Sequence, residues 1–278
     1  MTHNNVEFLP GEEAQDLNRT VRQARRWIET CRHSHRECGG RTTYEEHSEI
    51  KIKNLPTRLI DVGTSDGNIE PRLCLSSEIE QQSLVNGGLV ATGVSSSYQY
   101  LILSYCWGNP AAAAVTTKTN LNARLSGIPL RTLPKTIRDA IQITQKLLVR
   151  YLWVDALCII QDDTSDWAAE STRMGPYYEN ALCTIAATGA ADTTEGCFFE
   201  RRSLRFDVRP CLLNLQQTHE STSVWVLPVE VSWSQAVNRA RLNMRGWVKQ
   251  ERVLSPRTLH WSQVGVFWDC NGLVASEE

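Results

Sequence analysis

A Ser-Tyr-Cys-Trp-Gly run at residues 104–108 places polar and aromatic side chains at the carboxyl end of a short apolar segment. That segment, Tyr100–Tyr105, is typical of a buried strand. Open α/β sheets bind ligands at the carboxyl ends of their strands. Gly108 would allow close backbone approach, and Trp107 could stack on a base. We therefore expect a binding pocket lined by Ser104, Tyr105, Trp107 and Gly108; the alternative is a tight turn with Trp107 in the core.

Two carboxylates are notable for their surroundings. Asp155 interrupts a nearly continuous apolar run, Tyr151–Ile160, and a buried carboxylate needs partners. It could belong to the pocket, or it could form a structural ion pair with an arginine. Glu170 lies on an expected helix, one turn after Trp167, so that an aromatic wall stands beside a carboxylate. Glu170 could stabilise positive charge on a sugar, or it could be a solvated residue paired with Arg173.

A dense polar group surrounds a tryptophan near the C-terminal end of the chain. It consists of Arg245, Trp247, Gln250, Glu251 and Arg252. An arginine here could bind a pyrophosphate through two parallel hydrogen bonds. We therefore add Arg245, Trp247 and Glu251 to the candidate substrate-binding residues, together with Asp155 and Trp167. A salt-bridge network that fixes the C-terminal part of the chain explains the same residues.

A zinc site is suggested by Cys31, His35 and Cys38, with His33 as a possible fourth ligand. However, the first three also continue the apolar stripe of an expected helix, and the C-x₂₋₄-C spacing of zinc sites is absent. We therefore expect packing here and no metal site. The sequence also lacks the glycine-rich fingerprints of P-loop and Rossmann proteins, which argues against a kinase or a dehydrogenase.

The composition is ordinary for a globular protein: 278 residues, 41% hydrophobic and 22% charged, with a net charge of −2. That charge favours neither nucleic acid nor an anionic membrane as a partner. No apolar run reaches the length of a membrane span, and the first residues lack the pattern of a secretory signal. Without such a signal, the nine cysteines favour reduced thiols and a cytoplasmic location.

The N-terminal part predicts a helix and a hairpin. An apolar stripe at alternating steps of four and three predicts a helix over residues 12–38, ended by Gly39-Gly40. Residues 55–62 are expected to form a short strand, and residues 73–75 could pair with it after a turn.

The central part alternates strands and helices. A strand over 100–105 precedes a helix with Thr132 as its N-cap, and a strand over 151–160 follows. Ser165 would cap the next helix, which Gly175-Pro176 could kink. A strand over 182–187 ends this part. The order strand–helix–strand predicts a parallel sheet in which the strands at 100–105 and 152–160 are neighbours.

The C-terminal part predicts β-structure around a short helix. Strands are expected over 224–227, 257–261 and 264–270, and a helix over 245–253. We divide the chain into an extension of residues 1–97, a main domain of residues 98–270 and a tail of residues 271–278.

Four groups of motifs follow one another in the chain. They are Leu103–Gly108; Leu133–Ile137 with Tyr151–Gln161; Asp166–Glu170 with Met174-Gly175, Tyr178 and Asn180-Ala181; and Arg245–Arg252 with Leu254–Arg257. In this order they resemble the fungal heterokaryon-incompatibility (HET) domain, a cell-death module. The stretches Trp27–Cys38 and Leu55–Leu59 are similar to those that often precede such domains. Val248-Lys249 departs from the family, which more often carries less polar residues there.

The resemblance implies a fold and an activity. The HET family has been likened to the TIR domain, so we expect an α/β fold: a TIR/flavodoxin-like parallel sheet with an N-terminal helical extension and a C-terminal β-rich addition. Many TIR domains cleave NAD at the nicotinamide–ribose bond with a glutamate on the helix after the third strand. Glu170 occupies the analogous place. The resemblance therefore implies a TIR-like NAD glycohydrolase with Glu170 as its catalytic residue, NAD as substrate, no separate cofactor, and self-association for activity.

The alternative is a non-catalytic module that signals through self-association, because the same tryptophan-rich loops could form an interface. One cavity holding both Glu170 and Trp107 would favour the enzyme. Placement of the two residues on opposite faces, beside an apolar patch, would favour the module.

Overall fold

An eight-stranded mixed sheet organises the protein in the computed structural model, with strand order β10-β9-β8-β5-β3-β4-β1-β2. The structure describes residues 17–38, 55–63, 69–79, 99–108, 114–199, 211–217, 220–226 and 232–277. The four central strands are parallel: β3 (Tyr100–Ser104), β4 (Tyr151–Trp153), β5 (Cys183–Ala186) and β8 (Arg257–Trp261). Antiparallel strands flank them: β1 (Arg58–Asp61), β2 (Arg72–Leu75), β9 (Val266–Cys270) and β10 (Leu273–Ser276).

The predicted parallel pairing is confirmed. Leu101 and Ile102 of β3 are in register with Leu152 and Trp153 of β4. Numbered along the chain, the four parallel strands lie in the order second, first, third, fourth. Doubly wound sheets of the flavodoxin-like class begin with this order, and their ligands bind where the order reverses. Here that switch point lies at the carboxyl ends of β3 and β5.

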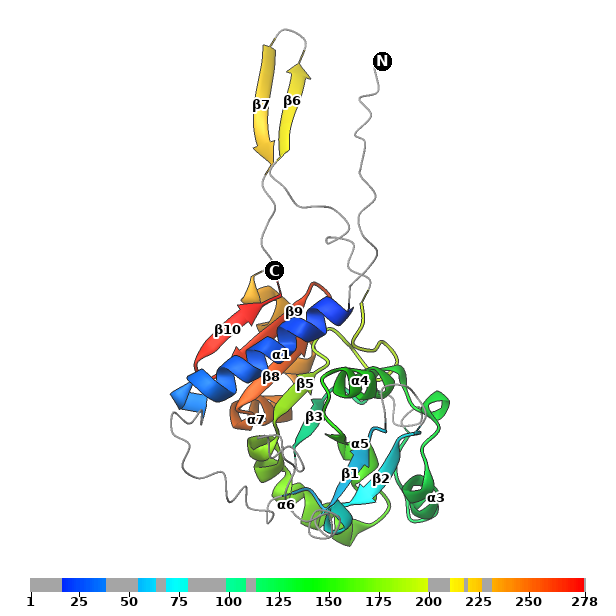
Figure 1. Ribbon diagram of the computed structural model, residues 1–278. Coiled ribbons are helices and arrows are strands. Elements are labelled where there is room, and N and C mark those ends of the chain that lie inside the picture. The colour runs from blue at the N-terminus through cyan, green and yellow to red at the C-terminus, as the bar shows by residue number, and fades with distance from the viewer. Residues whose placement is uncertain are drawn as a thin grey trace.

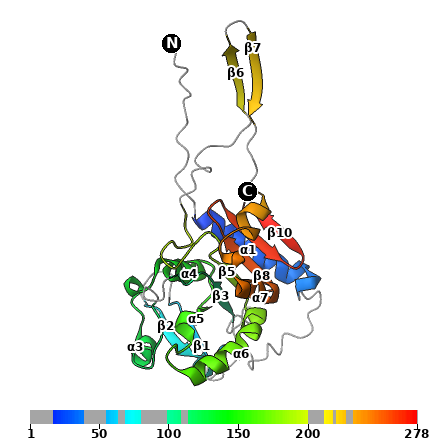
Figure 2. The same cartoon turned by 180° about the vertical axis from the view of Figure 1, so that it is seen from behind.

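Helices cover both faces of the sheet (Figures 1 and 2). The helix α4 (Lys135–Lys146), between β3 and β4, shares one face with α1 (Leu17–Ser34), whose Arg25 donates to the carbonyl of Lys146. The helix α6 (Thr164–Asn180), between β4 and β5, contacts α7 (Gly246–Leu254) on the opposite face. The connection from β3 to β4 and the connection from β4 to β5 run in opposite directions along the sheet. Right-handed connections that run in opposite directions place their helices on opposite faces of the sheet.

Short helices and a separate hairpin also belong to the described part of the chain. They are the 3₁₀ helices η1 (Arg36–Cys38), η4 (Leu130–Thr132) and η7 (Leu242–Met244), the α-helices α3 (Leu121–Ser126) and α5 (Asp155–Cys158), the π-helix η6 (Ser234–Asn238), and the two-stranded sheet of β6 (Cys211–Gln217) and β7 (Glu220–Val226).

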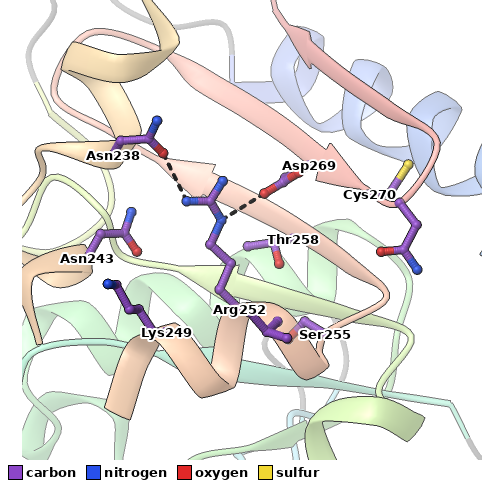
Figure 3. Close-up of a pocket in the computed structure, with 10 residues that line it drawn as sticks. Asn238, Asn243, Lys249, Arg252, Ser255, Thr258, Asp269 and Cys270 are labelled. Carbon is purple, nitrogen blue, oxygen red and sulfur yellow. Dashed lines mark hydrogen bonds and ion pairs between the residues drawn. The ribbon is translucent and has the colours of Figure 1, made fainter. Parts of the chain in front are cut away.

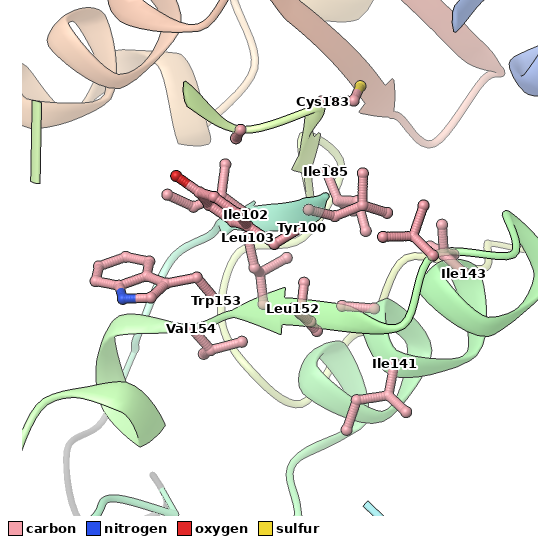
Figure 4. Packing of buried hydrophobic residues seen from close by; sticks show 14 of the residues in the cluster. Tyr100, Ile102, Leu103, Ile141, Ile143, Leu152, Trp153, Val154, Cys183 and Ile185 are labelled. Atoms are coloured by element: carbon pink, nitrogen blue, oxygen red, sulfur yellow. The ribbon is translucent and has the colours of Figure 1, made fainter. Parts of the chain in front are cut away.

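The core lies between the parallel strands and α4 (Figure 4). Leu103 of β3, Leu152 of β4 and Ile185 of β5 are buried there, and they pack in one cluster with Ile141 and Ile143 of α4. Strands covered on both faces need apolar residues at consecutive positions, which explains the unbroken runs in the sequence.

The predicted strand over 151–160 is wrong beyond Trp153, because the chain turns there into the short helix α5. Ala156, Leu157 and Cys158 are fully buried, so α5 is as apolar as the strand before it. Hydrophobic periodicity cannot distinguish a short buried helix from a strand. Asp155 therefore opens a helix at the carboxyl end of β4 and does not interrupt a strand.

Both predicted N-caps are also corrected. The helix expected to start at Thr132 has Pro134 at its N-cap position, and Thr132 ends η4. Asp163 caps α6, since its carboxylate accepts from the backbone N–H groups of Ser165 and Asp166. The helix continues through Pro176. Asp163 takes the N-cap position in place of Ser165, because its carboxylate is a strong acceptor at the positive end of the helix.

The N-terminal pieces belong to the same sheet and core as the rest. As predicted, β2 pairs with β1 as a hairpin, and β1 lies beside β4. Val21, Ala24 and Ile28 of α1 are buried in the main core, which confirms the predicted packing of this helix. The predicted residues 12–16, Gly39-Gly40 and 64–68 lie outside the described residues. The expected tail contributes β10 to the sheet edge, and residues 224–226 of the strand expected over 224–227 are part of β7, while residue 227 lies outside the described residues.

The eight cysteines whose side chains are described all carry free thiols. No helix in the described part of the chain is both long enough and apolar enough to cross a bilayer.

Candidate functional site

Helix α7 brings a carboxylate to the switch point of the sheet. Val248 of α7 packs with Cys106, Ala186 and Leu242 over the carboxyl ends of β3 and β5. One turn later, Glu251 accepts a hydrogen bond of 2.5 Å from Ser104 Oγ. The helix therefore places Glu251 at the last residue of β3, where this class of sheet binds ligands.

A second carboxylate, Asp155, lies beside the segment that follows β3. Its Oδ1 accepts from Tyr105 Oη at 3.0 Å and from the backbone N–H of Ala156 at 2.6 Å, and its Oδ2 accepts from Trp107 Nε1 at 2.8 Å. Three neutral donors thus hold this carboxylate. The expected ion pair is replaced by these donors, with the guanidinium of Arg245 as a further electrostatic influence.

Burial disfavours the charge on both carboxylates. Desolvation raises the pKa of Asp155, although the donors from Trp107, Ala156 and Tyr105 oppose it. Desolvation also raises the pKa of Glu251; the hydrogen bond from Ser104 opposes this rise, and the charge of Asp155 adds to it. Tyr178 of α6 faces both groups, and its own pKa is raised well above the ordinary value by burial and by Glu251 and Asp155. Carboxylates with environments of this kind are frequent in active sites.

The rim of this group is open to solvent. Arg245 is exposed, and its Nη1 donates to the carbonyl of Tyr105 at 2.7 Å. Trp107, Asp155 and Glu251 are each partly exposed.

Gly108 adopts a φ of +69°, and a Cβ there would lie 2.4 Å from Cβ of Asp192. The glycine thus permits close approach of the segment around Asp192, a protein contact rather than the expected ligand contact. We call Ser104, Tyr105, Trp107, Asp155, Tyr178, Arg245 and Glu251 the acid cluster.

Glu170 lies apart from the acid cluster. It is 2% exposed and accepts from Thr57 Oγ1 at 2.5 Å and from Tyr177 Oη at 3.0 Å. The interpretation as a solvated residue paired with Arg173 is therefore wrong. The catalytic interpretation is also opposed, since a side chain with this exposure and two protein donors offers no face to a substrate. Glu170 fixes α6 to the segment that enters β1.

The remaining candidate residues lie on the surface of α6 and α7. Trp167 is 54% exposed and Trp247 is 75% exposed. Arg252 donates to Asp269 of β9 at 2.9 Å and to Asn238 at 3.1 Å, which is the expected salt-bridge network for this residue.

A cavity of about 620 Å³ lies next to Arg252 (Figure 3). Most of the residues that line it have polar side chains, and they come from η6, η7, α7, β8 and β9; they include Asn238, Asn243, Lys249, Thr258 and Asp269. In Figure 3, Arg252 reaches across the cavity toward Asp269 and Asn238, and its guanidinium donates hydrogen bonds to both of these residues of the wall. The acid cluster residues are not among those that line this cavity.

The sequence identified six of the seven residues of the acid cluster but missed how they are connected. The run 104–108 and the segment 245–252 each stood out by composition, yet the Ser104–Glu251 contact joins residues 147 positions apart. Tyr178 was missed because a tyrosine within a helix gives no signal of the carboxylates it will face. One indication of its importance was present in the sequence, because Tyr178 belongs to the third group of motifs.

Comparison with known families adds one finding. The sequence model of the family described as "Heterokaryon incompatibility protein (HET)" matches residues 100–251, more than half of the chain. The matched region begins at β3 and ends at Glu251, so it contains every residue of the acid cluster. No curated protein and no solved structure matches the chain. The likeness to TIR domains therefore stays a prediction.

Proposed function

We propose that this chain, which belongs to the heterokaryon incompatibility family, acts as a cell-death effector by cleaving the N-glycosidic bond of NAD or a related nucleotide at the acid cluster. The observation that carries the proposal is the pairing of Glu251 with Ser104 at the switch point, beside the second carboxylate Asp155. This moves the catalytic role from Glu170 to Glu251.

The chemistry needs a carboxylate beside the sugar. When the bond from ribose C1′ to nicotinamide breaks, its electron pair stays on the ring nitrogen and positive charge develops on the ribose. Ionised Glu251 would stabilise that charge and then accept a proton from the water that attacks C1′. The products are nicotinamide, ADP-ribose and one proton.

The other residues of the cluster would bind and orient the nucleotide. The exposed guanidinium of Arg245 suits a diphosphate, because planar guanidinium groups bind phosphate oxygens bidentately. Trp247, two residues after Arg245 in the chain, offers an exposed ring for a base. Asp155 would keep Tyr105 and Trp107 in place through its hydrogen bonds.

Incubation with NAD tests the proposal. Purified protein, both dilute and clustered on a scaffold, is mixed with NAD while nicotinamide is followed by chromatography. Release of nicotinamide that increases on clustering supports the enzyme. Absence of release in both states, with folded protein, opposes it.

A second candidate function is a non-catalytic module that self-associates. The observation in its favour is a group of exposed apolar side chains on and next to α7: Met244 at 77%, Trp247 at 75% and Val253 at 81% exposure. Exposed tryptophans are frequent anchors of interfaces. Under this candidate, Trp247→Ala abolishes self-association in sedimentation experiments and abolishes cell death, while wild-type protein leaves NAD intact.

A further inference from the structure

Three cysteines and a histidine converge where the N-terminal helix meets the C-terminal hairpin. They are Cys31 in α1, His35, Cys38 in η1 and Cys270 at the end of β9. Their ligand atoms all lie within 4.8 Å of one another. Nδ1 of His35 lies 3.3 Å from Sγ of Cys270, although 235 positions separate the two residues.

Local backbone geometry explains the three N-terminal members. Steps of four and three along a helix place Cys31, His35 and Cys38 on one side. The helix α1 ends at Ser34, and the chain curls through η1, with hydrogen bonds from His35 N to Cys31 O at 3.2 Å and from Cys38 N to His35 O at 3.1 Å. This curl turns the three side chains toward a common point.

The fourth member is held there by the turn between β9 and β10. Asn271 Nδ2 donates to the carbonyl of Glu37 at 3.2 Å. A Cβ on Gly272 would lie 3.2 Å from ring atoms of His35, so a glycine lets this turn pack against the imidazole. Trp27 of α1 stacks on Trp268 of β9 with ring centroids 6.2 Å apart. The two segments are therefore docked by contacts on both sides of the group.

We propose that Cys31, His35, Cys38 and Cys270 bind one structural Zn²⁺ that joins α1 to the β9–β10 hairpin. Zinc bonds of about 2.0–2.3 Å at tetrahedral angles separate ligand atoms by roughly 3.5–3.8 Å. The ligand atoms lie within 4.8 Å of one another, and the 3.3 Å between His35 Nδ1 and Cys270 Sγ is close to that spacing. Thiolate and imidazole ligands select zinc over Ca²⁺ and Mg²⁺, which take oxygen ligands.

The surroundings fit a structural ion better than a catalytic one. Four protein ligands leave no open position for water or substrate. Cys31 and Cys38 are buried. Three thiolates around Zn²⁺ carry one net negative charge, and Arg257 of β8, whose Nη2 donates to the carbonyl of Cys38 at 3.0 Å, lies beside the group to balance it.

This proposal revises the expectation from the sequence. His33 is exposed and is not part of the group, and Cys270 takes the place assigned to it. The expected absence of metal is a prediction that this geometry now opposes. Packing and metal binding are compatible here, because the stripe that buries Val21, Ala24 and Ile28 continues into the ligands.

The test is the zinc content of the full-length chain purified without chelator under reducing conditions, measured by elemental analysis. We expect about one zinc per chain, the stoichiometry of a closed four-ligand site. We also expect strong visible absorption after replacement with Co²⁺, as tetrahedral thiolate coordination produces. Cys270→Ser and His35→Gln should reduce the metal content to near zero, whereas the neighbouring His33→Gln should leave it unchanged.

The variant His35→Cys separates metal binding from packing. It removes the imidazole but restores a ligand, so it should retain zinc and the melting temperature that His35→Gln loses. Wild-type protein that contains no zinc and takes up none from added ZnCl₂ would overturn the proposal. A disulfide between any two of the three cysteines in freshly reduced, metal-supplied protein would overturn it too.

Discussion

Ser104, the last residue of β3, donates a 2.5 Å hydrogen bond to Glu251 of α7, and this contact lies at the switch point of the sheet. It joins the first and the last of the four family motifs. The neighbouring carboxylate Asp155, itself held by three donors, makes the region rich in negative charge that burial disfavours. Such an arrangement costs stability, and function is the usual reason that proteins retain it.

Glu170→Gln is expected to destabilise the protein and to leave any enzymatic activity intact. The carboxylate accepts from Thr57 and Tyr177 in a buried place, so an amide nitrogen would face one of these donors. A buried donor left without an acceptor costs about 1–3 kcal/mol. A substitution at a surface position would change the stability by no more than about 0.5 kcal/mol. Urea unfolding measures the loss, and Glu179→Gln on the exposed side of α6 is the matched control. Equal stability of the two variants would contradict the assignment.

Arg58→Ala should be among the most damaging single changes. The guanidinium of Arg58 is buried; it donates to Cys158 O at 2.7 Å and to Asp166 at 2.5 Å, and so ties β1 to α5 and α6. Removal of one partner from a buried ion pair costs about 3–5 kcal/mol. The free energy of unfolding of this variant should fall by that amount, while exposed Arg173→Ala on α6 should change it by less than about 0.5 kcal/mol. A small effect at Arg58 would mean that the N-terminal hairpin is not integral to the fold.

The sequence predicted more of the fold than of the site. The strands around Leu101 and Leu152 and the buried face of α4 could be predicted, because apolar periodicity reports burial directly. The pairing of β1 beside β4 could not, since it depends on a hairpin far away in the chain. Burial of Glu170 was also hidden: its donors are Thr57, more than a hundred positions earlier, and a tyrosine two turns later.

The stability of the wild-type protein relative to Glu251→Gln should depend on pH in a direction that the raised pKa of Glu251 determines. An acid with a higher pKa in the folded state stabilises the fold at low pH. That contribution is complete below the unfolded pKa of about 4.3 and is lost as pH rises through the folded value. Glutamine has no such loss, so the variant should gain stability relative to wild type between about pH 4 and pH 7. Urea unfolding at both pH values measures this; a parallel change in both proteins would contradict the raised pKa.

The most direct test of the proposed function is nicotinamide release from NAD by clustered wild-type protein and clustered Glu251→Gln, with Glu179→Gln as the exposed-glutamate control. Glutamine keeps the size of residue 251 and an acceptor for Ser104 but removes the charge that would stabilise the ribosyl cation. We predict that wild type and the control release nicotinamide at similar rates, and that Glu251→Gln is slower by a factor on the order of 10²–10³, as for loss of one pre-organised transition-state contact. Release by folded Glu251→Gln at the wild-type rate would contradict the account.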